Sequence, residues 1–137
     1  MSLINIINFV SLGDERGCLA SLEKNHNVPF DIKRVYYIWD TKKGVSRGFH
    51  AHKKLMQVAV VLKGSCRFLL DNGTEKESVL LNDPLKGLLI NSFVWREMHD
   101  FSDDCILMVL ADEIYDESDY VRDYKEFKNL VKSDKYE

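Results

Sequence analysis

Short apolar runs recur along most of the chain, separated by Gly, Asn, Asp and Pro residues. Runs of about four to eight residues with this spacing are typical of an antiparallel sandwich or barrel. The strands that this pattern predicts are Asn5–Ser11, Cys18–Glu23, Lys33–Asp40, Gln57–Lys63, Ser65–Asp71, Glu77–Leu81, Gly87–Ile90, Val94–His99 and Cys105–Ala111. Asp71-Asn72-Gly73 indicates a hairpin, because Asn-Gly tolerates the positive φ of a type I′ turn.

The pattern changes after Asp112, where apolar side chains recur at a helical spacing. Val121, Tyr124, Leu130 and Val131 fit a period of about 3.6 residues. Ser118 or Asp119 can cap the start of such a helix. We therefore expect a short C-terminal helix that packs on the outside of the β-structure.

Composition is that of an ordinary globular domain. The chain has 137 residues with 45% hydrophobic and 30% charged side chains, which predicts one domain over residues 1–137. A net charge of −3 and a pI near 5.8 argue against nucleic acid or an anionic membrane as a partner. Cys18, Cys66 and Cys105 form no CxxC motif, and the N-terminus has no basic segment before its apolar run. These features favour reduced thiols and a cytoplasmic location, with no signal peptide and no membrane span.

A histidine pair stands out at the centre of the chain. Its pattern is Gly44-x5-His50-x-His52-x4-Gln57-x6-Gly64. Within a β-hairpin, residues two apart point to one face at a separation of about 6.6 Å. Both imidazoles could then reach neighbouring atoms of one small substrate.

This spacing resembles the first motif of the cupin superfamily, small β-barrels whose mouth holds a metal or a sugar. Gln57 stands where that motif has Glu. Pro84–Gly87 and Val94–His99 loosely match the second cupin motif, with Arg96 near the place of the expected His. The resemblance implies an all-β fold, a cupin-type β-barrel (jelly roll) with the short helix at its C-terminus.

The two departures argue against a metal centre. Guanidinium has no lone pair to offer a cation, and Gln57 would supply only a neutral amide. His99 could replace a missing ligand, so a metal-dependent cupin enzyme is an open alternative. We expect no metal and no cofactor. Two neighbouring imidazoles, which are rarely both charged, can instead serve as one base and one acid near neutral pH.

Four further segments carry a narrower resemblance. Asp31–Tyr37, Arg47–Lys54, Trp95–Phe101 and Tyr115–Arg122 resemble the dTDP-4-keto-6-deoxyglucose 3,4-ketoisomerases, and the likeness covers nearly the whole chain. Such enzymes move the keto group of a dTDP-linked 4-keto-6-deoxyhexose from C4 to C3 through a cis-enediol. A downstream PLP aminotransferase then forms a 3-amino sugar for a surface polysaccharide such as lipopolysaccharide or an S-layer glycan.

The resemblance implies three catalytic roles. His50 matches the residue that abstracts the C3 proton, and His52 matches the one that moves a proton between the C3 hydroxyl and the C4 oxygen. Tyr36 matches a tyrosine that can deliver a proton to C4. General acid and base groups of this kind each contribute roughly 10²- to 10⁴-fold.

Other side chains are candidates for binding. Arg47 and Arg34 suit the diphosphate, because guanidinium binds phosphate in a bidentate manner. Gln57 can hydrogen-bond the sugar or satisfy a buried backbone group, and His99 can line the pocket.

Arg16 and Arg96 lie in motifs that vary within the family. They leave the C4 configuration of the product open between galacto, gluco and a mixture.

Two further functional hypotheses stay open. A nucleotide-sugar binding module without turnover could use the same pocket. A sugar 3,5-epimerase would need a His with an Asp partner, and no such Asp is evident near His50. The exposed edge strands of a barrel are usually covered, so we expect a homodimer with exchange of N-terminal strands.

Overall fold

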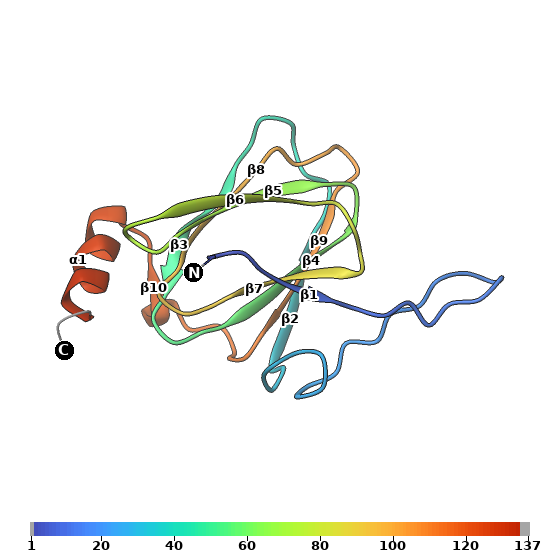
Figure 1. The fold of residues 1–137 in the computed structure, drawn as a ribbon. Coiled ribbons are helices and arrows are strands. Elements are labelled where there is room, and N and C mark those ends of the chain that lie inside the picture. The colour runs from blue at the N-terminus through green and yellow to red at the C-terminus, as the bar shows by residue number, and fades with distance from the viewer. Residues whose placement is uncertain (1, 135–137) are drawn as a thin grey trace.

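Two antiparallel sheets of five strands face each other and form a barrel in the computed structural model, which describes residues 2–134 (Figure 1). One sheet has the order β1-β7-β4-β9-β2 and the other has the order β10-β3-β8-β5-β6. The strands are β1 (Asn5–Asn8), β2 (Arg34–Ile38), β3 (Arg47–His52), β4 (Gln57–Lys63), β5 (Cys66–Asp71), β6 (Lys76–Leu81), β7 (Lys86–Ile90), β8 (Trp95–His99), β9 (Ile106–Ala111) and β10 (Tyr120–Val121). A 3₁₀ turn, η1, spans Glu117–Asp119, and helix α1 spans Tyr124–Asp134. The predicted all-β barrel with a C-terminal helix is confirmed.

Strand β4 shows why this chain forms two packed layers. Ala59 and Val61 join the core between the sheets, whereas Val58 and Val60 pack on the opposite face, against loop residues such as Phe30. Both faces of the strand are therefore buried, which explains its unbroken apolar sequence. Gln57, at the end of β4, is also buried and lies on the inner face, near the site described below.

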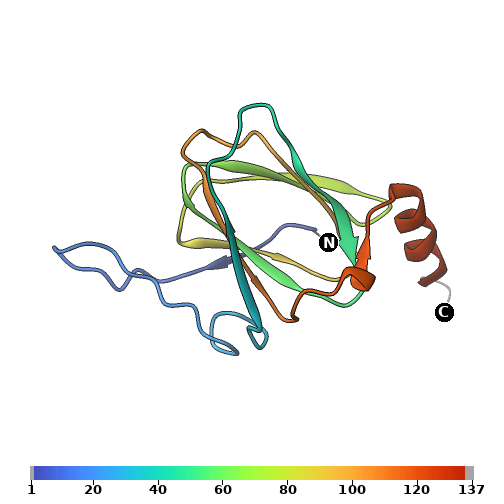
Figure 2. The same ribbon diagram turned by 180° about the vertical axis from the view of Figure 1, so that it is seen from behind.

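Helix α1 packs on the outer face of the sheet that contains β3 and β8 (Figures 1 and 2). Phe127 is fully buried there against Trp95. The helix starts later than the sequence pattern predicts, because the Asp123 carboxylate accepts hydrogen bonds from two backbone amides of the first turn. The predicted cap at Ser118 or Asp119 is wrong.

An arm formed by residues 10–24 extends from the barrel (Figures 1 and 2). The predicted strand Cys18–Glu23 is wrong, since none of these residues pairs with a strand and the isolated bridges nearby involve only residues outside the segment. Val10, Leu12 and Leu19 are 71%, 62% and 55% exposed. Their apolar side chains imitate a strand pattern but do not reach the core.

The turn between β5 and β6 confirms the predicted hairpin with a longer loop. Asp71 pairs with Lys76, so four residues connect the strands rather than the two of a type I′ turn. The Asn72 side chain accepts hydrogen bonds from the amides of Thr74 and Glu75, and this stabilises the wider loop. The loop lies beside α1.

Strand β3 contains a bulge and is missing from the strands that the apolar pattern predicts. Gly48 pairs with Glu97 and His50 pairs with Arg96, so Phe49 is an extra residue without a partner. Gly48 and Phe49 both have positive φ, at 92° and 56°. The bulge interrupts the alternation of side chains on which strand prediction depends. No helix in the described part of the chain is long and apolar enough to cross a membrane.

Candidate active site

A cavity of about 540 Å³ opens between β2 of one sheet and β3 of the other. Its lining is rich in cationic and aromatic side chains: Arg34, Tyr36, Ile38, Arg47, Gly48, His50, Met98, Tyr115, Tyr120 and Arg122. The structure thus brings together four of the predicted site residues, Arg34, Tyr36, Arg47 and His50.

His50 presents one free ring nitrogen to this cavity. Its Nδ1 lies 3.0 Å from the Gly48 carbonyl oxygen, which can only accept, so Nδ1 carries the proton and Nε2 keeps its lone pair. The side chain is 8% exposed. Burial, and then the positive charge of Arg96, lower the pKa of His50 to about 4. His50 is therefore a neutral base at neutral pH.

His52 lies directly beside His50 but deeper in the protein. The two ring centroids are 4.9 Å apart, and the ring of Tyr120 lies 4.4 Å from that of His52. His52 is fully buried and does not line the cavity. Its Nε2 is a buried nitrogen without a hydrogen-bond partner in the described residues.

Asp119 orients His52. The Oδ2 atom lies 3.2 Å from His52 Nδ1, and the same carboxylate accepts the amides of Lys54 and Leu55. The pKa of His52 is nevertheless lowered to about 2, because burial and the charge of Arg96 oppose protonation. The carboxylate thus fixes the Nδ1–H tautomer without making the ring cationic.

A chain of hydrogen bonds links three buried polar side chains below the cavity. Arg96 donates to Gln57 Oε1 at 2.5 Å, and Gln57 Nε2 donates to the Tyr36 hydroxyl at 3.2 Å. Tyr36 is the acceptor in that bond, so its own proton remains available. Burial raises the pKa of Tyr36, which keeps the hydroxyl protonated at neutral pH. The sequence suggests that Gln57 binds the sugar or satisfies a buried backbone group. In the structure its amide instead connects Arg96 to Tyr36, and it does not line the cavity.

Arg96 is a buried cation of unusual surroundings. It is 1% exposed, it also donates to the Val94 carbonyl oxygen, and its Nε has no partner in the described residues. Burial lowers its pKa to about 10, so it is still charged at neutral pH. Its field acts on both histidines and on Tyr36.

The cavity mouth is positively charged. The Arg34 guanidinium lies 5.2 Å from the ring centre of Tyr36 and 5.7 Å from that of Tyr115. Arg122 lies 4.1 Å from the ring centre of Tyr120 and forms an ion pair with Glu117. Together with Arg47, these guanidinium groups suit a phosphorylated ligand.

Four predicted binding residues do not line the cavity: Gln57 and Arg96 are buried below it, and His99 and Arg16 lie away from it. His99 is on the outer face of β8, where it contacts Ser46 and Glu97. Arg16 is on the arm, in an exposed ion pair with Asp14. The chain as described brings neither of them into contact with the lining residues.

Sequence reasoning missed the contribution of the segment before α1. Tyr115, Tyr120 and Arg122 line the cavity, and Asp119 holds His52 from 67 positions away in sequence. The two-residue strand β10, which pairs with His52 and Ala51, brings this segment to the site. The only signal in the sequence was the motif Tyr115–Arg122, which suggested a resemblance but no role.

The side chains present do not fit a metal ion. Within residues 2–134, no group of three or more His, Cys, Asp or Glu side chains is arranged to hold one. Gln57 and Arg96 are bonded to each other at the positions where the cupin pattern suggests ligands.

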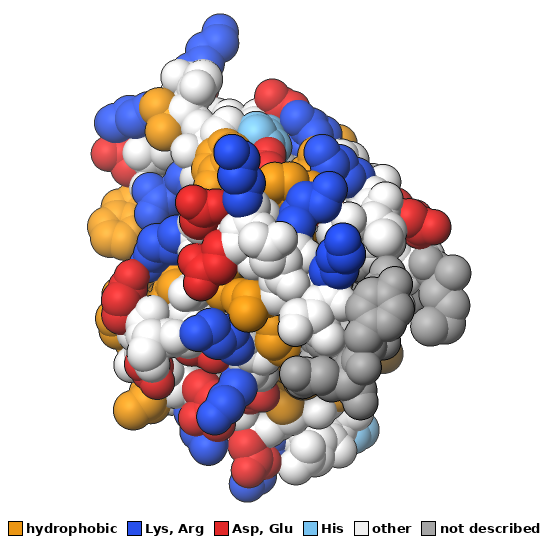
Figure 3. Space-filling model, turned by 90° about the vertical axis from the view of Figure 1, so that its left-hand side faces the viewer, with side chains coloured by type: hydrophobic (Ala, Val, Ile, Leu, Met, Phe, Trp, Pro, Cys, Tyr) orange, Lys and Arg blue, Asp and Glu red, His pale blue; other side chains and the backbone are white. Residues whose placement is uncertain are grey.

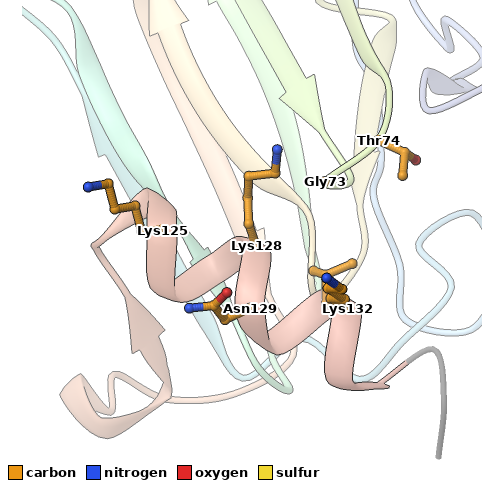
Figure 4. A pocket seen from close by; sticks show the side chains of 7 residues that line it. Gly73, Thr74, Lys125, Lys128, Asn129 and Lys132 are labelled. Carbon is orange, nitrogen blue, oxygen red and sulfur yellow. The ribbon is translucent and has the colours of Figure 1, made fainter.

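A second, larger hollow lies elsewhere, on the face that carries α1. It measures about 610 Å³ and is lined by Gly73, Thr74, Lys125, Lys128, Asn129, Val131 and Lys132 (Figure 4). Figure 3 shows this side of the molecule, where Lys and Arg side chains are mixed with Asp and Glu. It contains none of the predicted acid or base groups, so the smaller cavity is the better candidate for chemistry.

Comparisons with known proteins identify the family of this chain. The family model FdtA (WxcM-like, C-terminal) matches residues 2–132. A TDP-4-oxo-6-deoxy-alpha-D-glucose-3,4-oxoisomerase from Aneurinibacillus thermoaerophilus is 55% identical over 126 residues, which cover 92% of this chain and 91% of that protein.

Solved structures give the same picture. The sugar 3,4-ketoisomerase QdtA from Thermoanaerobacterium thermosaccharolyticum, in complex with TDP, has a TM-score of 0.93 at 45% identity, and 96% of each chain is covered. The RmlC epimerase of Mycobacterium tuberculosis, at 18% identity and a TM-score of 0.72, covers 84% of this chain and 66% of its own and shares the fold alone. The chain therefore belongs to the FdtA family of TDP-sugar 3,4-ketoisomerases.

Proposed function

We propose that this protein converts TDP-4-keto-6-deoxyglucose to the corresponding 3-keto sugar by acid and base catalysis without a metal. The observation that carries the proposal is His50, a neutral base whose free Nε2 faces a cavity that also contains Tyr36 and several arginines. The relative that is 55% identical is named for this 3,4-oxoisomerase reaction. The related QdtA structure contains TDP, which supports a nucleotide in the arginine-rich mouth.

The proposed reaction begins at C3. His50 Nε2 takes the C3 proton, and the electrons of the broken C–H bond form the C3–C4 double bond of an enediolate whose negative charge is on the C4 oxygen. A proton then moves from the C3 hydroxyl to the C4 oxygen, a transfer that we assign to His52. The C3 oxygen becomes the ketone when C4 takes a proton from Tyr36. The proton that His50 took then returns to Tyr36 through solvent, so both groups end in their starting forms. Arg96 supports this sequence, because a buried positive charge stabilises the negative charge of the enediolate.

Access is the main difference between the two histidines. His50 lines the cavity, whereas His52 reaches it only through its neighbours His50 and Tyr120. We therefore infer that Tyr120 shifts or relays the proton when the sugar binds. The hydroxyl of Tyr120 can both accept and donate, which suits a relay.

We also propose a homodimer. β2 is an edge strand of its sheet. Val35 and Tyr37 on this strand and Trp39 just after it are 51%, 62% and 64% exposed. The arm carries a second set of exposed apolar side chains. An arm from a second copy laid along this edge would cover both surfaces, and it is the simplest way to bring Arg16 near a cavity that β2 borders. Light scattering should give the mass of a dimer for the wild type. A variant in which residues 10–24 are deleted should have the mass of a monomer.

The biological setting is also a proposal. A 3-keto sugar is the substrate that a PLP aminotransferase requires to form a 3-amino sugar, so such an enzyme is the expected next step. Cys18, Cys66 and Cys105 are free thiols, which supports the predicted cytoplasmic location. Arg16 and Arg96 remain the candidates that set the face of protonation at C4.

One experiment tests the reaction directly. The protein is incubated with TDP-4-keto-6-deoxyglucose in D₂O, with and without a chelator, and C3 and C4 are followed by NMR. We expect deuterium at the exchanging carbon and a 3-keto product in both samples, and the coupling constants at C4 report whether the product is galacto or gluco. His50→Asn should abolish turnover but keep TDP binding, whereas His26→Asn, in an exposed turn, is the matched control.

The alternative functions predict different results in this experiment. Loss of activity in the chelator, restored by a stoichiometric divalent ion, would favour a metal-dependent enzyme. Binding of TDP-sugar without deuterium entry or product in the wild type would favour a binding module. Exchange at C5 would indicate an epimerase.

A further inference from the structure

A row of polar contacts runs along the outer face of β8, opposite the cavity. The Trp95 indole donates to Glu97 Oε2 at 3.0 Å, and Glu97 Oε1 lies 2.9 Å from His99 Nε2. His99 Nδ1 lies 2.8 Å from the Ser46 hydroxyl, and the rings of Phe49 and His99 pack nearly at right angles with centroids 5.7 Å apart. His99 therefore contacts the residue just before β3 and the extra residue of the bulge. We call Ser46, Phe49, Glu97 and His99 the bulge clamp.

The protons in this row can be assigned. A carboxylate only accepts, so the Nε2–H of His99 donates to Glu97. His99 Nδ1 and the Ser46 hydroxyl form the other hydrogen bond of the ring. The far end of the row is anchored by Trp95, which is 4% exposed beneath α1.

The bulge held by this clamp decides which side chains of β3 face the substrate. In a regular strand, positions 47 and 50 would point to opposite faces, because side chains alternate. The extra residue Phe49 resets the alternation, and Arg47 and His50 both line the cavity. Without the bulge, the proposed base and the proposed phosphate ligand could not share one site.

The bulge also sets the tautomer of His50. The Gly48 carbonyl oxygen that accepts the His50 Nδ1–H belongs to the bulge itself. The backbone conformation of the bulge is strained, since Phe49 is a bulky residue at a φ of 56°. Strained positions of this kind persist only when neighbouring contacts hold them. A Cβ on Gly48 would lie 2.9 Å from the Arg96 carbonyl oxygen, so no other residue can take its place without movement.

We propose that His99 is a positioning residue for His50: through Ser46 and Phe49 it holds the bulge in the form whose Gly48 carbonyl fixes the Nδ1–H tautomer of the base. This inference rests on the proposed function of His50 as the base. His99 touches no substrate in this account. It acts through the backbone of β3.

The test uses variants that loosen the clamp without entering the cavity. Ser46→Ala removes one hydrogen bond at an exposed position, and Ser46→Thr keeps the hydroxyl as its matched control. His99→Leu removes all contacts of the ring, and His26→Leu is the control for a histidine in an exposed turn. We expect Ser46→Ala and His99→Leu to lower kcat roughly 10- to 100-fold, as for a misplaced reacting group, with KM and TDP affinity unchanged.

A spectroscopic readout separates positioning from stability. The chain has four histidines, so long-range ¹H–¹⁵N correlation spectra can resolve each ring tautomer. We expect His50 as the Nδ1–H form in the wild type and in Ser46→Thr, and a mixture of tautomers in Ser46→Ala and His99→Leu. An unchanged His50 tautomer in Ser46→Ala, with wild-type kcat, overturns the inference, as does a lower Tm without any change in tautomer. The spectra need no turnover, so they test the positioning role of His99 even if the wild type fails to isomerise the sugar.

Discussion

Asp119→Asn is a perturbation whose effect can be worked out from individual atoms. Asp119 Oδ1 accepts the Lys54 amide at 2.9 Å, and Oδ2 faces His52 Nδ1 at 3.2 Å. In the variant, the amide oxygen is expected to keep the shorter contact to Lys54. The NH₂ group then faces His52 and gives up the longer contact of Oδ2 with the Leu55 amide, at 3.3 Å. A donor then faces Nδ1, so the ring favours the Nε2–H tautomer and loses the free nitrogen that the reaction needs.

The size of the effect follows from the strength of that contact. A hydrogen bond to a charged partner contributes about 1.5–3 kcal/mol, and about 1.4 kcal/mol corresponds to tenfold, so the productive tautomer should fall roughly 10- to 100-fold. We expect kcat for TDP-4-keto-6-deoxyglucose to fall by the same factor, with KM unchanged because Asp119 does not line the cavity. Steady-state kinetics and the His52 tautomer by ¹⁵N NMR provide the assay.

Asp116→Asn is a matched control, since Asp116 is exposed and bonds to Ser118 rather than to a histidine. If Asp119→Asn keeps its fold, shows the Nε2–H form of His52 and still turns over at the wild-type rate, His52 has no role in proton transfer and the reasoning fails. If the tautomer does not change, the assignment of the Asp119 contact is wrong.

Three further results are expected. Tyr36→Phe should lower kcat roughly 100-fold while TDP affinity stays the same, because it removes a proton donor from the cavity; an unchanged kcat would exclude Tyr36 as the acid. Arg96→Met removes a positive charge that lowers the pKa of His50, so the acid limb of the kcat/KM profile should move to higher pH, and a shift to lower pH would contradict the electrostatic account. The folded protein should lose stability as the pH falls below about 6.5, because the histidines of the unfolded state then bind protons, whereas His50 and His52, with pKa values of about 4 and about 2, stay neutral in the folded state. The two groups together should lower the free energy of unfolding by up to about 4 kcal/mol at pH 5. An equal free energy of unfolding at pH 7 and pH 5 in denaturant titrations would refute this.

The elements that the sequence predicts well are those whose signal is local. Gln57–Lys63 is found with its correct bounds, because strands buried on both faces are unbroken apolar runs. Cys18–Glu23 shows the limit of that signal, since an apolar run without a neighbouring strand stays exposed. Strand β3 escapes the apolar pattern because its bulge breaks the alternation and its inward side chains are polar.

The site was predictable as far as it lies within motifs. Tyr36, Arg47 and His50 were identified from their neighbours in sequence, and the structure brings them into one cavity. Asp119 and Tyr120 could not be assigned a role in this way, because their contact with His52 depends on pairing between β10 and β3 across a long segment.

The buried guanidinium of Arg96 also has a consequence for how this fold can evolve or be engineered. A charge removed from water without a carboxylate partner costs several kcal/mol, so an apolar side chain of similar volume should make the empty protein more resistant to heat. The anionic substrate compensates for part of that cost, and its binding should raise Tm more in the wild type than in Arg96→Met. Screens that select for heat resistance alone will therefore favour the loss of Arg96, and with it the part of the activity that its charge supplies.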